Sequence, residues 1–494
     1  MAAFTNILSN LNQMLNSALW GRGMLFCFLA VGLLFTVGTR FFQVRWFSEW
    51  MRLTIGSVFS RKNTRQQPAA HSITPFQALS TALAAAIGTG NIVGVAIALS
   101  TGGPGAIFWM WASAFLGMMT SFAEKALGIR YRYKDAKNRW VGGAMVYMEK
   151  GLHCKWMALL FAALCIPVSF GMGNLSQSNS MAQAMENTFG IPPLVTGAVA
   201  AALIGVILLG GIKRIAGVTE KLVPIMAVLY LAAGCIVICL NARRLPQAFG
   251  AIFAEAFSLR PAVGGAAGYG MARALRTGVS MGVFSNEAGL GTSVIVHCDA
   301  DVNEPVEQGM WGIFEVFADT LVCCTITALA ILTSGIWSPS TPLSGAALCA
   351  AAFSTAFGGV GKTFIAVSVV LFAFATLIGW SYYGERAVSY LFGDRATPYY
   401  KVLFSAVVLL GSTVKMELAW SLSDTFNALL AIPNLIAITI LSREVLQMTR
   451  DYVRRILQRP KTGGGRINPA SSGHNKGERP QSRGTTPQGA RKDW

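Results

Sequence analysis

The sequence predicts an all-α integral membrane protein with about 11 transmembrane helices. The 494 residues are 53% hydrophobic and only 13% charged, with a mean hydropathy of +0.50, whereas soluble domains are about 25% charged. No charged side chain occurs from Phe76 to Ala123, and roughly 20 apolar residues are enough to cross a bilayer. Lys and Arg also gather in alternate loops, as the positive-inside rule requires.

The first span is expected at Met24–Thr39. No Lys or Arg precedes Trp20 and no small-residue cleavage pattern follows the span, so we interpret it as a true span and not a cleaved signal peptide. The uncharged stretch holds the second and third spans, divided by a Gly-Pro turn at "TGGPG" (Thr101–Gly105). The other apolar segments are Trp156–Met185, Pro193–Gly211, Leu222–Asn241, Thr277–Cys298, Gly309–Gly335, Thr363–Phe392, Val402–Val414 and Leu418–Ser442.

Charge predicts an external amino terminus and a cytoplasmic carboxyl terminus. With that orientation most basic loops lie inside, and the outer loops 101–105, 186–192 and 336–361 contain no Lys or Arg. Two loops depart from the rule, because an outer loop carries Arg243, Arg244 and Arg260 and the inner segment 299–307 is acidic.

The net charge of +18 suits this orientation and contact with anionic lipid, and no nucleic-acid motif accompanies it. The tail 443–494 is basic and poor in apolar residues, so it is expected to be disordered and cytoplasmic. The nine cysteines show no metal or disulfide spacing, which indicates packing residues.

The stretch "AAAIGTGNIVG" (Ala84–Gly94) weakens a predicted span with glycines and polar residues. Gly90 and Gly94 form a GxxxG pair, which often serves only close helix packing. Thr89 and Asn91 favour a site instead, because polar side chains are costly in hydrocarbon unless they face protein or water.

A second polar patch, "FSNEAGLGTS" (Phe284–Ser293), interrupts a later span. When the first span is set aside, the two interrupted helices are first and sixth of ten. They therefore occupy equivalent places in two halves of five, 76–241 and 277–442, flanked by the segments 1–75 and 242–276. Five is odd, so the halves lie in opposite orientations, as in secondary transporters that bind substrate at the bilayer midplane.

These patches resemble a known family. "GTGNIVGVAIAL", "GGPGAIFWMW", "TSFAEKALGIRYR", "FSNEAGLGTS" and "FAFATLIGWSYYGERAVSYLFG" closely resemble motifs of the alanine/glycine:cation symporters, also called sodium:alanine symporters. The resemblance runs from about Trp20 to Leu441. It implies a LeuT-type 5+5 inverted repeat with one extra amino-terminal helix, a prokaryotic inner-membrane location, and sodium-driven uptake of alanine or glycine. Family members often carry Arg or Thr where this chain has Ala85 and Ala86, which bears on ion coupling and selectivity.

The resemblance also implies substrate-contacting residues. In the first interrupted helix these are Gly88, Thr89, Gly90 and Asn91, acting mainly through their backbone. Elsewhere Gln177, Phe284, Ser285, Asn286 and Trp380 are expected at the substrate pocket. Gln177 could instead form an interhelical hydrogen bond, and Phe284 or Trp380 could belong to the core.

Other polar residues have less defined expectations. Gly173, Asn174, Gln177 and Ser180 are expected to share one helix face. Glu287 could pair with a basic group, hold the unwound segment, or touch the substrate. We expect Glu124 at the membrane interface beside Lys or Arg, and Asp319 inside the membrane. A sodium site is expected between backbone oxygens near Ala85 and Gly88 and the hydroxyl of Thr376, which shares a face with Phe372 and Trp380.

The function expected is cation-coupled symport of small neutral amino acids by alternating access. The alternatives are a channel, a symporter for another small amino acid such as glutamine or serine, and proton coupling. An enzyme is disfavoured because no metal cluster or Ser-His pairing is visible and three of the four histidines, His71, His153 and His474, fall in loops or the tail. No cofactor is expected besides the transported sodium ion.

Overall fold

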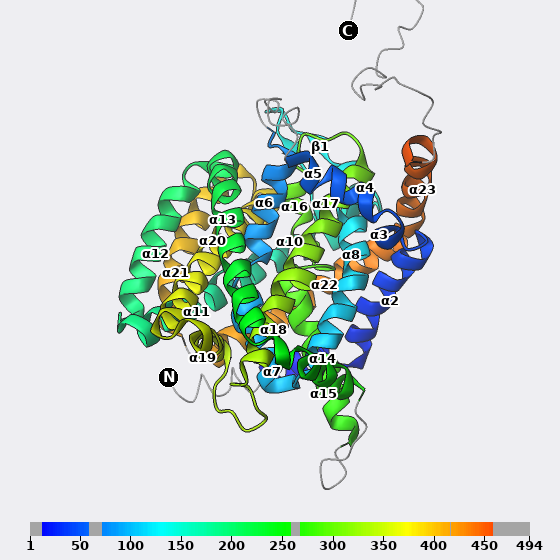
Figure 1. The fold of residues 1–494 in the computed structure, drawn as a ribbon. Coiled ribbons are helices and arrows are strands. Elements are labelled where there is room, and N and C mark those ends of the chain that lie inside the picture. The colour runs from blue at the N-terminus through cyan, green and yellow to red at the C-terminus, as the bar shows by residue number, and fades with distance from the viewer. Residues whose placement is uncertain (1–11, 59–71, 258–266, 415, 458–494) are drawn as a thin grey trace, which may run out of the picture. The chain divides into compact units, whose positions relative to one another are not determined.

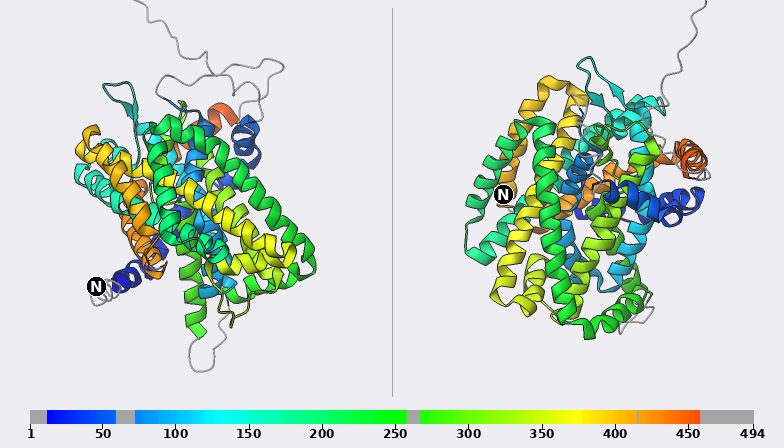
Figure 2. Two further views of the ribbon diagram at one scale, coloured as in Figure 1. Left: turned by 90° about the vertical axis from the view of Figure 1, so that its left-hand side faces the viewer. Right: turned by 45° about the horizontal axis from the view of Figure 1, so that its top comes forward.

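A computed structural model describes residues 12–58, 72–257, 267–414 and 416–457. The chain divides into two units, Met1–Asp451 and Tyr452–Trp494. Of the second unit the described part is little more than the π-helical turn Val453–Leu457. Within the first unit the helices pack side by side in a bundle, with the contacting pair α12 and α21 on one flank (Figure 1, Figure 2).

The first half of the chain contains the helices and the small hairpin that follow: α2 (Arg22–Gly38), α3 (Phe42–Arg45), α4 (Phe47–Leu53), α5 (Ile55–Val58), α6 (Pro75–Ala86), η1 (Gly90–Gly94), α7 (Val95–Gly102), α8 (Gly105–Tyr131), β1 (Tyr133–Lys134), β2 (Trp140–Val141), α9 (Ala144–Lys150), α10 (Lys155–Phe170), η2 (Gly171–Leu175), α11 (Ser176–Phe189), α12 (Pro193–Leu208) and α13 (Gly211–Leu240).

The second half continues with helices only: η3 (Ala242–Arg244), α14 (Leu245–Ala256), α15 (Ala267–Asn286), α16 (Val294–His297), α17 (Pro305–Val316), η4 (Phe317–Cys324), α18 (Thr325–Ser334), α19 (Gly345–Phe357), α20 (Gly359–Phe392), η5 (Asp394–Ala396), α21 (Thr397–Gly411), α22 (Met416–Ile440) and α23 (Ser442–Tyr452). The all-α class predicted from the sequence is therefore confirmed.

Seven helices of the described chain are long and apolar enough to cross a membrane, and the bent pair α6–α7 makes up to eight. Each predicted span coincides with helical segments, but some of these helices, α12 among them, are too short to count as membrane-crossing by length. The number of about 11 spans therefore stays a prediction.

The apolar side chains show which faces meet lipid. Exposed Leu, Val and Ile residues gather on α12 and α13, whereas polar and charged residues including Glu124, Lys125 and Asp319 are fully buried. This arrangement is the reverse of a soluble protein's, and it is stable where hydrocarbon surrounds the molecule.

Three long helices are interrupted by π-helical turns. These turns are η1 between α6 and α7, η2 between α10 and α11, and η4 between α17 and α18. α6 begins with a capping box in which Thr74 and Gln77 exchange side-chain and backbone hydrogen bonds, and it meets α7 at a bend of 49°. Such π turns often mark functional sites, because they free backbone groups from the regular helical pattern.

The second interruption predicted from the sequence separates α15 from α16. Three residues in it have positive φ: Glu287 at 56°, Gly289 at 94° and Gly291 at 73°. Glycine adopts this backbone conformation readily, whereas Glu287 does so at a cost.

Some elements differ from the sequence-based expectation. The segment 242–276 contains α14 and the start of α15, and the outer loop 336–361 contains α19. The tail begins as helix α23, and residues 458–494, including His474, lie outside the described residues, as does His71.

Candidate functional site

The first helix break redirects two backbone N–H groups. Gly88 and Thr89 would complete another helical turn with the carbonyls of Ala84 and Ala85. Instead, Gly88 N–H donates to Asn91 Oδ1 at 3.0 Å and Thr89 N–H donates to an oxygen of Gln177 at 3.2 Å. The carbonyl oxygens at the end of α6 are thereby released from helical bonding.

Gln177 connects this break to the η2 turn. Its Oε1 also accepts from the Thr89 hydroxyl at 2.8 Å, while its Nε2 donates to the Met172 carbonyl at 3.0 Å. Both ends of the amide are therefore bonded, which fixes its orientation between α11 and the first interrupted helix.

Asp319 joins the two interrupted helices. Its Oδ1 accepts from the Asn91 amide at 2.7 Å, and its Oδ2 accepts from the hydroxyls of Ser285 at 2.8 Å and Thr320 at 2.6 Å. Asn286 donates to the Thr320 hydroxyl at 3.1 Å. Predicted residues from both interruptions therefore meet at one carboxylate on η4.

An aromatic wall covers the first break. A Cβ on Gly90 would lie 3.3 Å from Phe284 Cδ1, so the ring already touches the backbone there. The Phe284 ring stacks on Trp420 of α22 with centroids 4.7 Å apart, and Trp420 also lies against Gly94. Any side chain at Gly90 would have to displace this aromatic pair.

Thr376 brings a hydroxyl to the end of α6. It donates to the Ala84 carbonyl at 3.0 Å and to Phe372 of its own helix at 3.1 Å. A Cβ on Gly88 would overlap Thr376 Oγ1, and a Cβ on Gly379 would lie 2.8 Å from Ala85 N. The backbone of α6 is therefore in direct contact with α20 at the place where the sequence predicts the sodium site.

Trp380 is fully buried one turn further along α20. Its side chain packs directly on Gly173, and its ring meets Tyr383 edge-on with centroids 5.3 Å apart. Gly173 is required here because a Cβ would overlap the indole.

The model of the sodium:alanine symporter family matches residues 5–463. The chain belongs to the sodium:alanine symporter family. Among relatives, the sodium/alanine symporter AgcS of Methanococcus maripaludis is 40% identical over 88% of this chain and 95% of its own length. The probable sodium/glutamine symporter GlnT of Bacillus subtilis is 41% identical over 91% of each chain. The protein is therefore a cation-coupled amino-acid symporter and not an enzyme.

Solved structures establish the fold of this symporter. MhsT in complex with L-phenylalanine aligns with a TM-score of 0.52 at 14% identity, covering 78% of this chain and 99% of that one. A manganese transporter of Eremococcus coleocola aligns at 0.53 and 13% identity, covering 78% and 81%. The predicted LeuT-type fold is confirmed.

Not every predicted residue of the symporter reaches the site. Asn174 donates to the Phe404 carbonyl on α21 at 2.8 Å, and Ser180 donates to the Ser176 carbonyl of its own helix at 2.7 Å. Of the expected polar face on α10–α11, Gln177 alone among these residues bonds to the first break.

Glu124 lies inside the bundle beside Lys125, whose nitrogen is 3.9 Å from its Oε2, so the expected pairing with a basic residue is confirmed. Its side chain is fully buried, and Oε1 accepts from backbone N–H groups of Gly289 and Gly291, both at 3.1 Å. An unwound segment presents N–H groups that a neighbouring carboxylate can satisfy, and this outweighs the preference of Glu for water.

Three residues in and around the candidate site had no role assigned to them from the sequence. Asp319 was recognised as intramembrane without a role, while Trp420 and Lys125 were not considered as site residues. A charged pair inside a span, Glu124–Lys125, was the visible signal for the last.

Proposed function

We propose that this symporter couples sodium entry to the uptake of alanine or glycine. The observation that carries the proposal is the close approach of the Phe284 ring to Gly90, with Trp420 stacked behind that ring, which leaves little room beside the break for a large substrate side chain. The two relatives, named as a sodium/alanine and a probable sodium/glutamine symporter, support sodium and a small neutral amino acid.

The substrate carboxylate is proposed to bind at the first break. The N–H and hydroxyl of Thr89 both donate to Gln177 Oε1 in this structure. A carboxylate has the same acceptor chemistry, so it can take these donors when the Gln177 amide turns aside, and the Gln177 Nε2 group can then donate to it.

Sodium is proposed to bind between α6 and α20. The carbonyls of Ala84 and Ala85 have lost their helical donors, and the Thr376 hydroxyl already lies 3.0 Å from the Ala84 oxygen. Carbonyl and hydroxyl oxygens can replace the water ligands of sodium without formal charge. Gly88 adds a further backbone oxygen, and its lack of a side chain lets the Thr376 hydroxyl lie against this backbone.

The proposed setting is the inner membrane of a prokaryote, with the amino terminus outside and the carboxyl terminus in the cytoplasm. The basic loops support this orientation.

The test is uptake of labelled alanine by proteoliposomes under an inward sodium gradient. We expect accumulation that alanine and glycine inhibit, that leucine and phenylalanine do not, and that disappears in sodium-free buffer. If glutamine alone inhibits uptake, the proposed substrate is glutamine and not alanine or glycine. Accumulation driven by a proton gradient without sodium would refute sodium coupling.

A further inference from the structure

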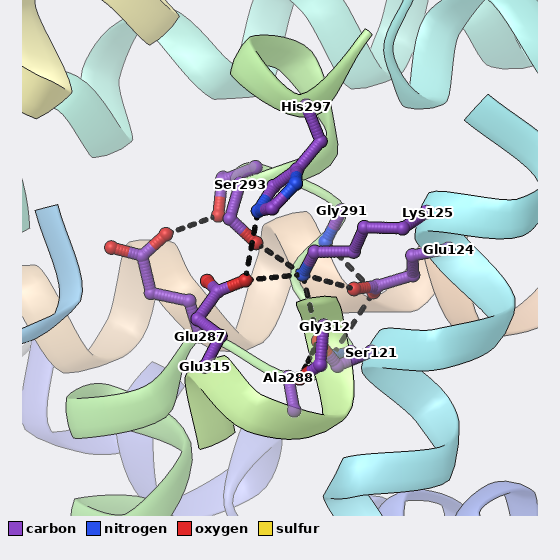
Figure 3. Close-up of polar contacts among 12 residues, drawn as sticks. Ser121, Glu124, Lys125, Glu287, Ala288, Gly291, Ser293, His297, Gly312 and Glu315 are labelled. Carbon is purple, nitrogen blue, oxygen red and sulfur yellow. Dashed lines mark hydrogen bonds and ion pairs between the residues drawn. The ribbon is translucent and has the colours of Figure 1, made fainter. Parts of the chain in front are cut away.

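A buried charge network lies beside the second helix break (Figure 3). The Lys125 ammonium pairs with Glu315 of α17 at 3.1 Å and donates to the hydroxyls of Ser121 at 2.7 Å and Ser293 at 2.6 Å. Glu124 Oε2 lies 3.9 Å from the same nitrogen. All five side chains are fully buried, so bulk water does not screen their charges.

Glu124 has the surroundings of an ionised carboxylate. Its Oε1 accepts the two N–H bonds of Gly289 and Gly291 and a third from the Asn434 amide at 2.6 Å. Three donors on one oxygen, together with Lys125 near the other, favour the negative form.

Glu315 also has the surroundings of an ionised carboxylate. Its Oε2 accepts from Lys125 and lies 3.2 Å from His297 Nε2. Gln308 is hydrogen-bonded to the other ring nitrogen of His297. A neutral imidazole satisfies both contacts, because it accepts from the Gln308 amide and donates to Glu315. Lys125 therefore faces two carboxyl groups, Glu124 and Glu315, with a single positive charge.

Among the described residues, Glu287 forms no ion pair with a cation. Its Oε2 accepts from the Thr292 hydroxyl at 2.6 Å, and its carboxyl group points away from the Lys125 ammonium (Figure 3). Its Oε1 has no hydrogen-bond partner among the described residues, although the side chain is fully buried. Glu124 Oε2 and Glu315 Oε1 also have none there, but those two carboxyl groups lie within 4 Å of the Lys125 ammonium. A third negative charge here would be buried without compensation, and a buried carboxyl group avoids this by holding a proton.

We propose that Glu287 is a proton-binding site whose proton is exchanged during the transport cycle. The ligand is a single proton on the carboxyl group, bound in the state that the structure describes. Loss of the proton leaves a carboxylate whose Oε1 needs hydrogen-bond donors.

Two donors are in place on α20. Trp380 Nε1 and the Tyr383 hydroxyl are both fully buried and form no well-aligned hydrogen bond within the described chain, and both are close enough to Glu287 to interact with it, Trp380 as a hydrogen-bond donor. Ionised Glu287 attracts these two groups, whereas the protonated form does not. Because Trp380 is a proposed wall of the substrate pocket, the proton is coupled to the shape of that pocket.

Other titratable groups surround Glu287 and its network from each neighbouring element, and a change in their protonation would also alter its charge balance. They are Glu124 and Lys125 on α8, Tyr147 on α9, Cys165 on α10, His297 on α16, Glu315 on α17, Asp319 on η4 and Tyr383 on α20.

The first test is proton titration of the purified, full-length symporter. Wild type should release one more proton than Glu287→Gln over the pH range in which the protein stays folded, because glutamine keeps the shape and cannot ionise. The measurement needs no transport, so it is independent of the proposed substrate and of sodium. Superimposable titration curves would overturn the proposal.

The second test is the pH profile of sodium-driven uptake with equal pH on both sides of the membrane. Wild-type uptake should fall about tenfold for each pH unit above the apparent pKa of the Glu287 carboxyl group. The profile of Glu287→Gln, normalised to its own maximum, should be flat. Glu287→Asp restores a titratable carboxyl group and should restore the fall. A falling profile in Glu287→Gln would assign the pH dependence to another group and refute the coupling.

Discussion

At the scale of single residues, glycines let the polar groups of the site approach the backbone. Gly88 lies where a Cβ would overlap the Thr376 hydroxyl and stand 3.3 Å from Gln177 Oε1. Gly173 and Gly379 allow α20 to reach α10–α11 and α6 in the same way. The Ala84 carbonyl and the Thr376 hydroxyl meet at the contact between α6 and α20. Valine at position 376 removes this hydroxyl with little change of shape.

Thr376→Val is predicted to weaken sodium binding and leave the fold intact. The substitution removes one of several proposed oxygen ligands, so the sodium concentration for half-maximal alanine uptake should rise about fivefold to tenfold, with partial recovery at saturating sodium. Initial uptake rates over a sodium series measure this. The matched control is Thr439→Val, since the Thr439 hydroxyl donates only within α22, to Leu435 at 2.6 Å. An unmoved sodium dependence in Thr376→Val would contradict the proposed site.

Most residues that the structure brings together at the candidate site were expected from the sequence, but their partners were not. The polar interruptions at Thr89–Asn91 and Ser285–Asn286 are visible because polar groups inside an apolar run are costly. That both reach Asp319 depends on which helices become neighbours, and the sequence spacing does not specify this. Trp420 was missed because one aromatic residue in a span is ordinarily core or interfacial.

At the scale of elements, the Lys125 network ties three helices together. Lys125 on α8 reaches Glu315 on α17 and Ser293 at the start of α16, so the segment after the second break is bound to both α8 and α17. In hydrocarbon a buried pair of charges is costly to form, but the loss of one partner is costlier still.

Lys125→Met is predicted to lower the free energy of unfolding by about 3 to 5 kcal/mol, because it leaves Glu315 buried without its cation. The double variant Lys125→Met with Glu315→Gln removes both charges of this pair and should recover part of the loss, because Glu124 keeps its three hydrogen-bond donors. Thermal unfolding of the purified variants measures both. If the double variant is no more stable than the single one, the pair does not account for the loss.

Some elements could not be predicted from hydropathy. The hairpin of β1 and β2 is polar, and it is held by Lys137 and Arg139, which pair with Asp394 at 3.1 Å and 2.7 Å. The Ser389 hydroxyl and these cations hold the pKa of Asp394 well below its usual range. Such contacts join segments over 250 residues apart, whereas the periodicity of apolar residues reports only local structure.

At the scale of the whole molecule, one end of the bundle is closed by the segment that follows α16. Arg132 donates to the carbonyls of Cys298 and Ala300, both at 2.6 Å, and also to Val302. Ile73, just before α6, forms a parallel bridge with Ala300. Both interrupted helices therefore join the same closure.

Alternating access requires these contacts to break when this end opens. Asp299 of the same segment accepts from the Tyr382 hydroxyl, and a cavity of about 450 Å³ lined by Asp299, Tyr382 and Arg386 adjoins the closure. Water can enter from that cavity once the segment moves. Cys298 is 1% exposed, so its thiol reports the movement directly.

Arg132→Met is predicted to raise the rate at which a membrane-impermeant maleimide labels Cys298 in inside-out vesicles. Removing the three charge-assisted hydrogen bonds costs the closed state about 1.5 to 3 kcal/mol for each bond that water does not replace, so the open population should grow at least about tenfold. Arg130→Met is the matched control, because it removes the same charge from an exposed neighbour. Cys298→Ser defines the background from the other cysteines. Equal labelling rates in the Arg132 and Arg130 variants would mean that Arg132 does not hold this end closed.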